Sequence, residues 1–409
     1  MSARALLLLV CALGVTLAGG ARANSVYSAG GLGEPMLEEQ ARLRALGGAG
    51  VAEHGPRGFS LANPASLAEV QHLLLEGTIV ATTRWVEATS YPEETLHETL
   101  LPSVHGAIAL PGRIVFGGGY IAARNAAFHA YRSDSSGAAS VSEIDGTGGM
   151  NYVRATLSRQ FTREIRLGLD YDFIVGNYRE EWTRSFPDSG IQDARDTLEI
   201  SWETKGRLRV GVQFVRGGLA LGAVYEVERD LPLQATRRAY GVVVSDPSRT
   251  LTIPAGYVVG FSAPVSRLVR AVGQYRHAAW QRSSVQSELV DFRAEQRFSF
   301  GVERTPVLEE GASFWSRIPL RLGGYYLLWP DLLPVAGGAD ISAGTGHVDE
   351  WAVTLGSGIA SQDRGGSIDF SLEVGRRGDR EVLGASEKFL RFGVSFFVSD
   401  ETWKGTLHK

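Results

Sequence analysis

The chain has 409 residues, with 41 basic and 45 acidic side chains, a net charge of −4 and a single cysteine. This charge argues against nucleic-acid binding through a strongly basic surface, and one cysteine excludes an intrachain disulfide and a cysteine-based zinc site. With 44% hydrophobic and 21% charged residues, the composition is that of a folded chain.

The first 23 residues have the pattern of a secretory signal peptide. Arg4 precedes an apolar run from Ala5 to Gly19, and Ala21-Arg22-Ala23 matches a small-residue cleavage site. An uncleaved membrane anchor is the alternative, although a spanning helix needs about 20 apolar residues. Cleavage before Asn24 would leave a chain without cysteine, because Cys11 lies in the apolar run.

One stretch before residue 70 has the pattern of a helix. Pro35 suits a first helical turn, the run extends to Leu46, and Gly47-Gly48 would end it. We predict that residues 24–70 occupy the inside of a larger structure, because they are rich in glycine and too short to form a core of their own. An ordinary N-terminal loop is the alternative.

From about residue 73 onward, apolar residues alternate with polar ones. The clearest case is a segment in which Ile368, Phe370, Leu372 and Val374 fall on one face and Asp369, Ser371 and Glu373 on the other. Charged residues beside glycine on the polar face, in segments of about ten residues, are typical of a transmembrane barrel with a wet lumen. A soluble all-β protein is the alternative, since any sheet with one wet face alternates in this way.

The alternation predicts an all-β, closed antiparallel transmembrane β-barrel of about 14 strands over residues 71–400, followed by a periplasmic tail at 401–409. No window after residue 23 offers 18 uncharged apolar residues, so no transmembrane helix is expected. Tight connections alternate with long ones at 124–149, 178–194, 230–249 and 329–347, as expected for the two rims of such a barrel. The predicted strands are 73–90, 103–110, 113–123, 150–161, 164–177, 195–216, 218–229, 250–262, 266–281, 290–304, 316–328, 348–361, 366–376 and 387–399.

Several segments resemble a known family. Gly30 to Pro35, Arg44 to Ala52 and Ser60 to Ala68 are similar to the N-terminal segment of FadL-like outer-membrane transporters of hydrophobic compounds, and Leu251 to Gly256 and Ile318 to Tyr325 are similar to two of their strands. In that family a segment ending in Asn-Pro-Ala forms a hatch inside the barrel. The resemblance therefore implies a hatch here, with the motif Asn63, Pro64 and Ala65. Independently, Pro64 disfavours helical geometry at Asn63, whose side chain suits a turn.

The resemblance also implies a function. The first expectation is an outer-membrane barrel of a Gram-negative-type bacterium for passive uptake of hydrophobic small molecules such as long-chain fatty acids. The alternative is a PorV-type scaffold or shuttle for secretion or surface attachment. The expected partners are outer-membrane lipid, a hydrophobic ligand (a fatty acid or hydrocarbon) and the outer-membrane barrel assembly machinery, with no nucleic acid.

The sequence contains no motif that indicates an enzyme, a cofactor or a metal site. None of the eight histidines forms a His-Glu-x-x-His pair, and no nucleophile elbow or phosphate-binding loop is present. Inner-face charges are predicted to form a lumen network, either solvated and mutually paired or in contact with substrate: Arg166, Asp170, Arg321, Asp369, Glu373 and Arg391. Tyr120, Tyr325 and Trp329 are expected in an interfacial girdle or, as the alternative, in a lumen pocket. Because the lumen should be wet, we expect Ser371→Arg to be milder than Leu372→Arg.

Overall fold

A computed structural model describes residues 25–28, 33–55, 59–88, 93–134, 140–186, 192–239, 242–245, 249–283, 292–307, 313–334, 345–360 and 365–400. The predicted signal peptide (1–23) and C-terminal tail (401–409) lie outside these ranges. Within them, no helix is long and apolar enough to cross a membrane.

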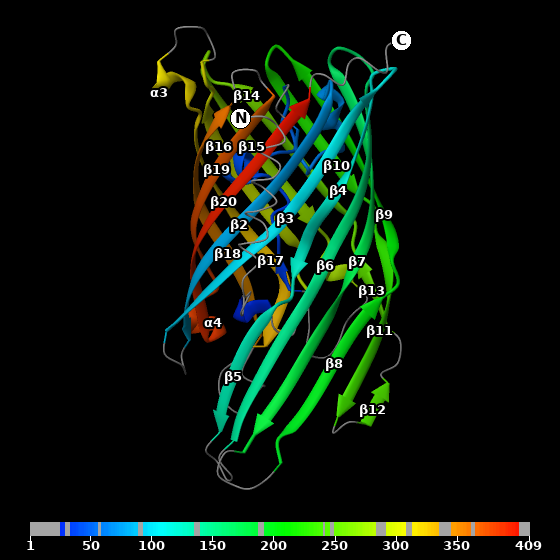
Figure 1. Cartoon of the computed structure of the whole chain (residues 1–409), viewed down its shortest axis with the longest axis vertical. Helices are drawn as coiled ribbons and strands as arrows, with labels where there is room; N and C mark the ends of the chain where they lie inside the picture. The colour runs from blue at the N-terminus through cyan, green and yellow to red at the C-terminus, as the bar shows by residue number, and fades with distance from the viewer. Residues whose placement is uncertain are drawn as a thin grey trace.

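The chain forms a closed antiparallel β-barrel of 14 strands (Figure 1). The ring closes where β20 pairs with β2 from Leu73↔Asp400 to Ala88↔Ala385. Four barrel strands are each interrupted: β4 with β5, β8 with β9, and β10 with β11 form three of them, and β12, β13 and β14 together form the fourth. The predicted fold class and strand number are confirmed.

The strands are β1 (Glu34–Pro35), β2 (Leu73–Ala88), β3 (Glu94–Leu110), β4 (Ile114–Asn125), β5 (Phe128–Asp134), β6 (Ser140–Gln160), β7 (Ile165–Ser185), β8 (Ala194–Trp202), β9 (Lys205–Arg216), β10 (Leu219–Glu226), β11 (Arg229–Ala239), β12 (Val242–Ser245), β13 (Arg249–Ile253), β14 (Gly256–Pro264), β15 (Val269–Ala278), β16 (Glu295–Arg304), β17 (Leu320–Pro334), β18 (Thr345–Ala360), β19 (Gly366–Arg377) and β20 (Ala385–Asp400). The helical segments are η1 (Val26–Ser28), α2 (Ala41–Arg44), η2 (Pro64–Glu69), η3 (Trp280–Arg282), α3 (Phe314–Arg317) and α4 (Arg380–Leu383).

The period-two pattern sorts side chains between the outer surface and the lumen. On β18, Leu355 is 50% exposed on the outside, whereas the adjacent Thr354 is buried inside. On β19, the inward-facing Asp369, Ser371 and Glu373 are all buried. Outward apolar residues in a continuous belt are what a lipid-facing surface requires, because an open or polar surface would be costly in hydrocarbon.

The two rims differ. At one rim, where β2 begins and β20 ends, most connections are short turns, which marks it as the periplasmic rim. At the opposite rim, β5, β6, β7, β8, β11 and β12 project beyond the rest of the barrel (Figure 1). The predicted long loops at 124–149 and 178–194 are largely wrong, because β6 begins at Ser140 and β7 continues to Ser185. Beyond the lipid-facing part of the barrel, these strands continue as hairpins with polar side chains.

Residues 33–55 and 59–70, together called the hatch below, lie inside the barrel, as the blue segment in Figure 1 shows. The predicted helix from Pro35 to Leu46 is mostly wrong. Pro35 lies in β1 and pairs with Arg124 of β4, and α2 comprises only four residues. The amide of Ala41, which as a first-turn donor has no partner within the helix, donates to the barrel at Ser395 Oγ, at 2.6 Å. The stop at Gly47 is as expected, with φ +71°.

The chain before the hatch reaches the extracellular end of the lumen. Ser25 Oγ donates to Glu387 Oε1 at 2.8 Å, near the start of β20. Tyr27 packs edge-on against Trp329, with ring centroids 6.4 Å apart. From there the chain descends through the lumen to the start of β2 at the periplasmic rim. It therefore fills the barrel over much of its height.

The lumen beside the hatch is packed, which removes the premise on which Ser371→Arg was expected to be the milder substitution, and it holds two of the aromatic residues expected in a girdle. Ser371 is only 1% exposed. Tyr325 and Trp329 are buried inside the barrel in an apolar cluster with Tyr27 and Leu383, not in an interfacial girdle. Of the three aromatic residues considered, only Tyr120 lies exposed on the outside.

Candidate functional site

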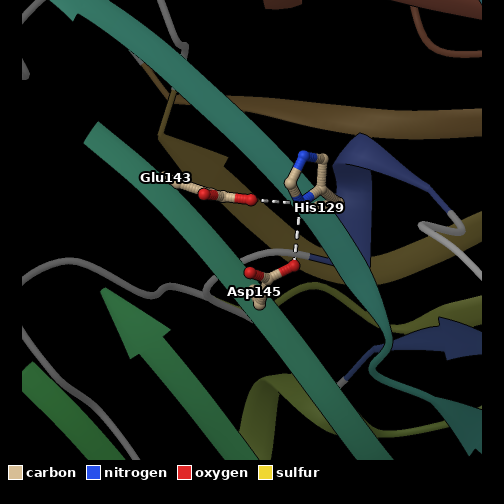
Figure 2. A group of neighbouring side chains, drawn as sticks. All are labelled: His129, Glu143 and Asp145. Atoms are coloured by element: carbon tan, nitrogen blue, oxygen red, sulfur yellow. Dashed lines mark hydrogen bonds and ion pairs between the residues drawn. The ribbon is translucent and has the colours of Figure 1, made fainter. Parts of the chain in front are cut away.

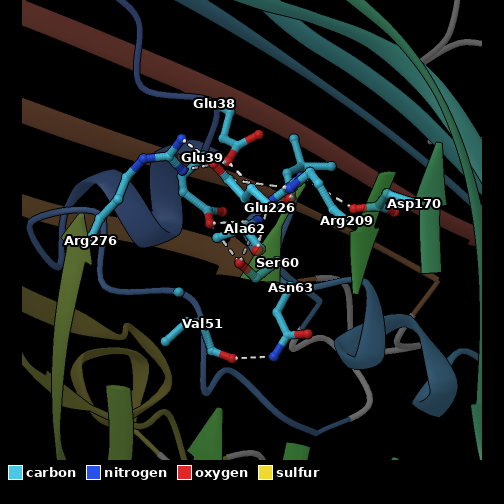
Figure 3. Close-up of polar contacts among 12 residues, drawn as sticks. Glu38, Glu39, Val51, Ser60, Ala62, Asn63, Asp170, Arg209, Glu226 and Arg276 are labelled. Atoms are coloured by element: carbon cyan, nitrogen blue, oxygen red, sulfur yellow. Dashed lines mark hydrogen bonds and ion pairs between the residues drawn. The ribbon is translucent and has the colours of Figure 1, made fainter. Parts of the chain in front are cut away.

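The interface between the hatch and the barrel is the most elaborate site in the described residues. Its turn at Asn63-Pro64-Ala65 is drawn in Figure 3, where Asn63 points toward Val51. Asn63 Oδ1 accepts from the amide of Ala65 at 3.0 Å and caps η2. Its Nδ2 donates to the carbonyls of Val51 at 2.7 Å and of Val212 on β9 at 3.3 Å. One fully buried side chain thus joins two parts of the hatch to the barrel.

Glycines on the inner face of the barrel allow the Asn63-Pro64-Ala65 turn to lie close to the backbone of the strands. A Cβ at Gly168 of β7 would lie 2.3 Å from the carbonyl carbon of Pro64. A Cβ at Gly211 of β9 would lie 2.3 Å from Asn63 Oδ1. No real side chain fits at such distances, so the glycines are required by close contact with the hatch.

Buried ion pairs hold the hatch at its extracellular end. Glu34 accepts from Arg84 of β2 at 2.7 Å, from Arg377 of β19 at 2.6 Å and from Arg391 of β20 at 2.8 Å. Glu350 of β18 also accepts from Arg377 and Arg391, at 2.7 and 2.9 Å. Three guanidinium groups from three strands therefore converge on one hatch carboxylate.

A second cluster lies nearer the periplasmic rim. Hatch residues Arg42 and Glu53 pair with each other at 3.0 Å. Glu53 accepts from Arg270 of β15 at 2.7 Å, and Glu303 of β16 accepts from Arg42 at 3.3 Å and from Arg270 at 2.6 Å. The cluster continues from Glu303 to Arg321 of β17, at 2.7 Å.

A third cluster surrounds hatch residue Glu38, shown in Figure 3 with Arg209 and Arg276. Glu38 lies 3.7 Å from Arg209 and 3.3 Å from Arg154. Glu226 of β10 accepts from Arg276 at 3.1 Å and lies 3.4 Å from Arg209. The guanidinium of Arg209 also donates to the carbonyl of Ala62 at 2.8 Å, so the same group holds both side chain and backbone of the hatch.

The six lumen charges singled out in the sequence are all buried, but they are divided among different clusters. Arg391 and Glu373 lie 3.6 Å apart in the Glu34 cluster, Arg321 and Asp369 pair at 2.7 Å near the periplasmic rim, and Asp170 accepts from Arg209 at 3.2 Å. Arg166 is separate from them and pairs with hatch residue Glu69. The charges are thus paired with one another and with the hatch.

Sequence reasoning missed the hatch side of these clusters. Four hatch carboxylates bind arginines of the barrel: Glu34, Glu38, Glu53 and Glu69. The signal was present, because several of the partner arginines occupy polar positions of alternating strands, and the hatch has an excess of acidic residues. The sequence did not predict the position along the barrel axis at which each hatch residue contacts a strand.

Two hatch carboxyls differ sharply in their electrostatic environment. Burial alone would raise the pKa of Glu34, but Arg377, Arg84 and Arg391 hold the pKa of that carboxyl well below its usual range. Glu39 has no such cation. Burial raises the pKa of the Glu39 carboxyl to about 7, against hydrogen bonds from Ser60 and the Ala62 amide. The Oε2 of Glu39 has no hydrogen-bond partner in the described residues.

Two cavities adjoin the hatch. One within the lumen has a volume of about 100 Å³ and is lined by charged residues that include Glu38, Arg154 and Glu226. Ligand pockets for small molecules usually have about 300–1,000 Å³, so this cavity suits a few waters. The other, of about 670 Å³, opens at the periplasmic rim and is also lined by charged groups, among them Arg42 and Glu303.

A group of possible metal ligands lies away from the hatch, on the hairpin of β5 and β6 beyond the extracellular rim (Figure 2). His129 Nδ1 lies 2.7 Å from Asp145 Oδ1 and 3.8 Å from Glu143 Oε1. Both carboxylates are about half exposed. The geometry is that of a surface ion pair, so we assign no metal to it.

Comparisons with known proteins agree with the barrel fold. The family model described as BamG matches residues 1–215. No curated protein matches the chain in sequence. Among solved structures, a FadL homologue of Pseudomonas aeruginosa is similar with a TM-score of 0.61 at 12% identity, covering 90% of this chain and 99% of that one.

Two further solved structures are similar over most of their length. The Ralstonia pickettii toluene transporter TbuX gives a TM-score of 0.56 at 16% identity, covering 89% of this chain and 99% of that one. The CymD monoaromatic hydrocarbon channel gives 0.54 at 15% identity, covering 89% and 98%. At these identities the likeness concerns the fold, and it confirms the FadL-like barrel that the sequence resemblance implied.

Proposed function

The chain belongs to the BamG family, and from that premise we propose that it is a sealed outer-membrane barrel that holds a protein partner of the outer-membrane barrel assembly machinery. Its place is the outer membrane of a Gram-negative-type bacterium, to which residues 1–23 direct export. Residues 24–70 serve as the hatch, 71–400 as the barrel and 401–409 as a periplasmic tail. This role needs no catalytic group and no cofactor, and it corresponds to the scaffold alternative raised by the sequence.

The observation that carries the proposal is the pairing of hatch carboxylates with arginines around the barrel. Glu34 and Glu38 each contact guanidinium groups from different strands, and Glu53 contacts Arg270 of β15. Removing one partner of such a buried pair costs about 3–5 kcal/mol, so displacing the whole hatch for each passing molecule would be costly. A barrel closed in this way suits binding at its rims better than conduction.

The experiment measures partner binding and conductance on the same preparation. The full chain, purified from its own membrane in mild detergent, should bring down barrel-assembly components in a fixed ratio. In planar bilayers it should be closed, and deletion of residues 24–70 should open it. Recovery as a free barrel that conducts without the deletion would contradict the proposal.

A second candidate is passive uptake of hydrophobic small molecules, which the fold shared with hydrocarbon channels favours. One feature of the described residues supports it: an apolar cluster at the extracellular side of the lumen, which includes Ile174, Leu231, Ile253 and Trp280. Its side chains are apolar, as the binding of a hydrophobic ligand requires. Fatty acids and aromatic hydrocarbons are both ligands of this class.

Mass spectrometry of small molecules extracted from the purified protein separates the two candidates. A fatty acid or hydrocarbon at about one per barrel, lost in Trp280→Ala, would favour uptake. Absence of such a ligand together with a stable protein partner would favour the scaffold. Because the two readouts are independent, both can be scored on one sample.

A further inference from the structure

The lipid-facing surface has a groove of about 720 Å³ near the periplasmic rim, on strands β16 to β20. It is almost wholly apolar. Strand register sets its sides: Leu322, Leu355, Leu372 and Phe392 form one row across four strands, and Leu320, Ser357 and Phe370 form the adjacent row.

The groove exists because a small residue stands between large ones. Ser357 lies between Leu320 and Phe370, and its Oγ donates to the carbonyl of Pro319 at 2.9 Å, so it presents little bulk to the lipid. Phe370 and Phe392 stack at one side, with ring centroids 6.3 Å apart and planes 18° from parallel. The rings form a firm edge instead of filling the gap.

The end of the groove at the periplasmic rim is cationic. Arg304, the last residue of β16, lines the groove. Its guanidinium donates to the carbonyls of Trp315 at 2.7 Å and Ile318 at 2.9 Å and pairs with no carboxylate in the described part of the chain. Arg317, in α3 of the connection that follows β16, does not line the groove, and its Nε is buried. The acidic residues Glu309 and Glu310 of this connection lie outside the described ranges.

We propose that this groove binds an anionic phospholipid of the periplasmic leaflet, with one acyl chain against the leucine and phenylalanine rows and the phosphate at Arg304. The groove faces hydrocarbon, where an acyl chain fills an apolar hollow without displacing water. Arg304 ends β16 at the periplasmic rim, and its guanidinium bonds the carbonyl of Trp315, whose side chain is 73% exposed and suits the interface. Arginine binds phosphate through paired N–H donors. The site depends on the membrane orientation and on neither candidate function.

The test is lipid retention by the full mature chain folded into vesicles of phosphatidylethanolamine and phosphatidylglycerol at 3:1. After extraction into mild detergent, native mass spectrometry should show one retained lipid per barrel. Phosphatidylglycerol should be enriched over the vesicle ratio by about fivefold, since one basic residue near an anionic surface contributes about that factor. Arg304→Gln should lower the enrichment by about fivefold.

Two variants test whether lipid retention depends on the shape of the groove or on positive charge alone. Ser357→Phe fills the hollow but keeps Arg304, and it should abolish the retained lipid. Arg159→Gln is the matched control: Arg159 is an exposed residue near the end of β6 at the same rim, outside the groove, and its loss should change nothing. Heat-modifiable gel mobility confirms that each variant is folded.

Three outcomes overturn the proposal: no enrichment in the unaltered chain, equal retention by the Ser357→Phe variant, or equal losses in Arg304→Gln and Arg159→Gln. A dimer mass that survives delipidation without a lipid adduct also overturns it. In that case the groove belongs to an interface between two copies of the chain.

Discussion

Glu34 and Arg377 lie 343 positions apart in the sequence, yet Glu34 Oε1 accepts from Arg377 Nη2 at 2.6 Å inside the barrel. Arg377 is fully buried and also pairs with Glu350 and Glu387. The hatch carboxylate thus contacts the guanidinium groups of three barrel strands at once, at Arg84, Arg377 and Arg391. Hatch and barrel are expected to fold as one unit for this reason.

Glu34→Gln should therefore destabilise the folded barrel by about 3–5 kcal/mol, because it leaves buried guanidinium groups without their shared counter-ion. Urea unfolding in lipid vesicles measures the loss. Lys388→Gln is the control, since Lys388 pairs with Glu87 on the surface, where ion pairs contribute little. If both substitutions lowered the free energy of unfolding equally, the buried cluster would contribute no more to stability than a surface ion pair.

Asn63→Ala should loosen the hatch turn. The substitution removes the cap of η2, which is worth about 0.5–2 kcal/mol, and leaves the buried carbonyl of Val51 without its side-chain donor. Limited proteolysis of the membrane-inserted protein should then cut within residues 59–70, where the unaltered chain resists. Asn63→Asp keeps the acceptor for the Ala65 amide but not the donor, so it tells the two roles apart.

Gly211→Ala should displace the hatch from β9, because the added methyl would lie 2.3 Å from Asn63 Oδ1 and 2.8 Å from the Pro64 ring. Overpacking of this kind costs about 1–3 kcal/mol. Gly77→Ala, on β2, is the control: its nearest neighbour would be Val104 Cγ2 at 4.0 Å. The measurement is the midpoint of thermal unfolding of each variant in vesicles. A lower midpoint for Gly77→Ala than for Gly211→Ala would contradict a close contact between the hatch and Gly211.

Stability should fall as pH rises through the titration of Glu39. Its folded-state pKa of about 7 lies above the ordinary value of 4.5, so the folded protein holds a proton that the unfolded chain releases. The free energy of unfolding is therefore highest below pH 4.5. It decreases between pH 4.5 and pH 7, by about 3 kcal/mol at most.

The measurement is urea unfolding at pH 5 and pH 8 for the unaltered chain and for Glu39→Gln. The glutamine variant lacks the proton release, so its stability should depend less on pH by the amount just given. The same pH dependence in both proteins would mean that other groups are responsible.

Sequence alone predicted the barrel because lipid imposes period two on every strand, and Ile368 to Val374 shows that period without interruption. It predicted the Asn63 turn through a resemblance and through the local chemistry of Asn-Pro. It failed at Pro35, where pairing with Arg124 of β4 replaced the expected helix. Contacts across hundreds of residues leave no local pattern, so the partners of Arg166 and Arg391 were not predictable.

The last prediction concerns Ser371 and Leu372, which point to opposite sides of β19. Leu372→Arg places a charge on the lipid-facing surface and should cost about 2–4 kcal/mol if it lies near the bilayer midplane. A wet lumen would make Ser371→Arg the milder change. The lumen is packed here instead: Ser371 is 1% exposed, and a Cβ at Gly393 beside it would meet Ser371 Oγ at 2.4 Å.

We therefore expect Ser371→Arg to be as damaging as Leu372→Arg, for a different reason. The arginine would need to displace the hatch near Arg44, which already pairs with Glu373 at 2.7 Å, and it would add a second buried cation beside Arg44. Deleting residues 24–70 makes room for the new side chain. Folding yields into vesicles should then recover for Ser371→Arg in the deletion background and stay low for Leu372→Arg, whereas recovery of both or of neither would contradict a packed hatch as the cause.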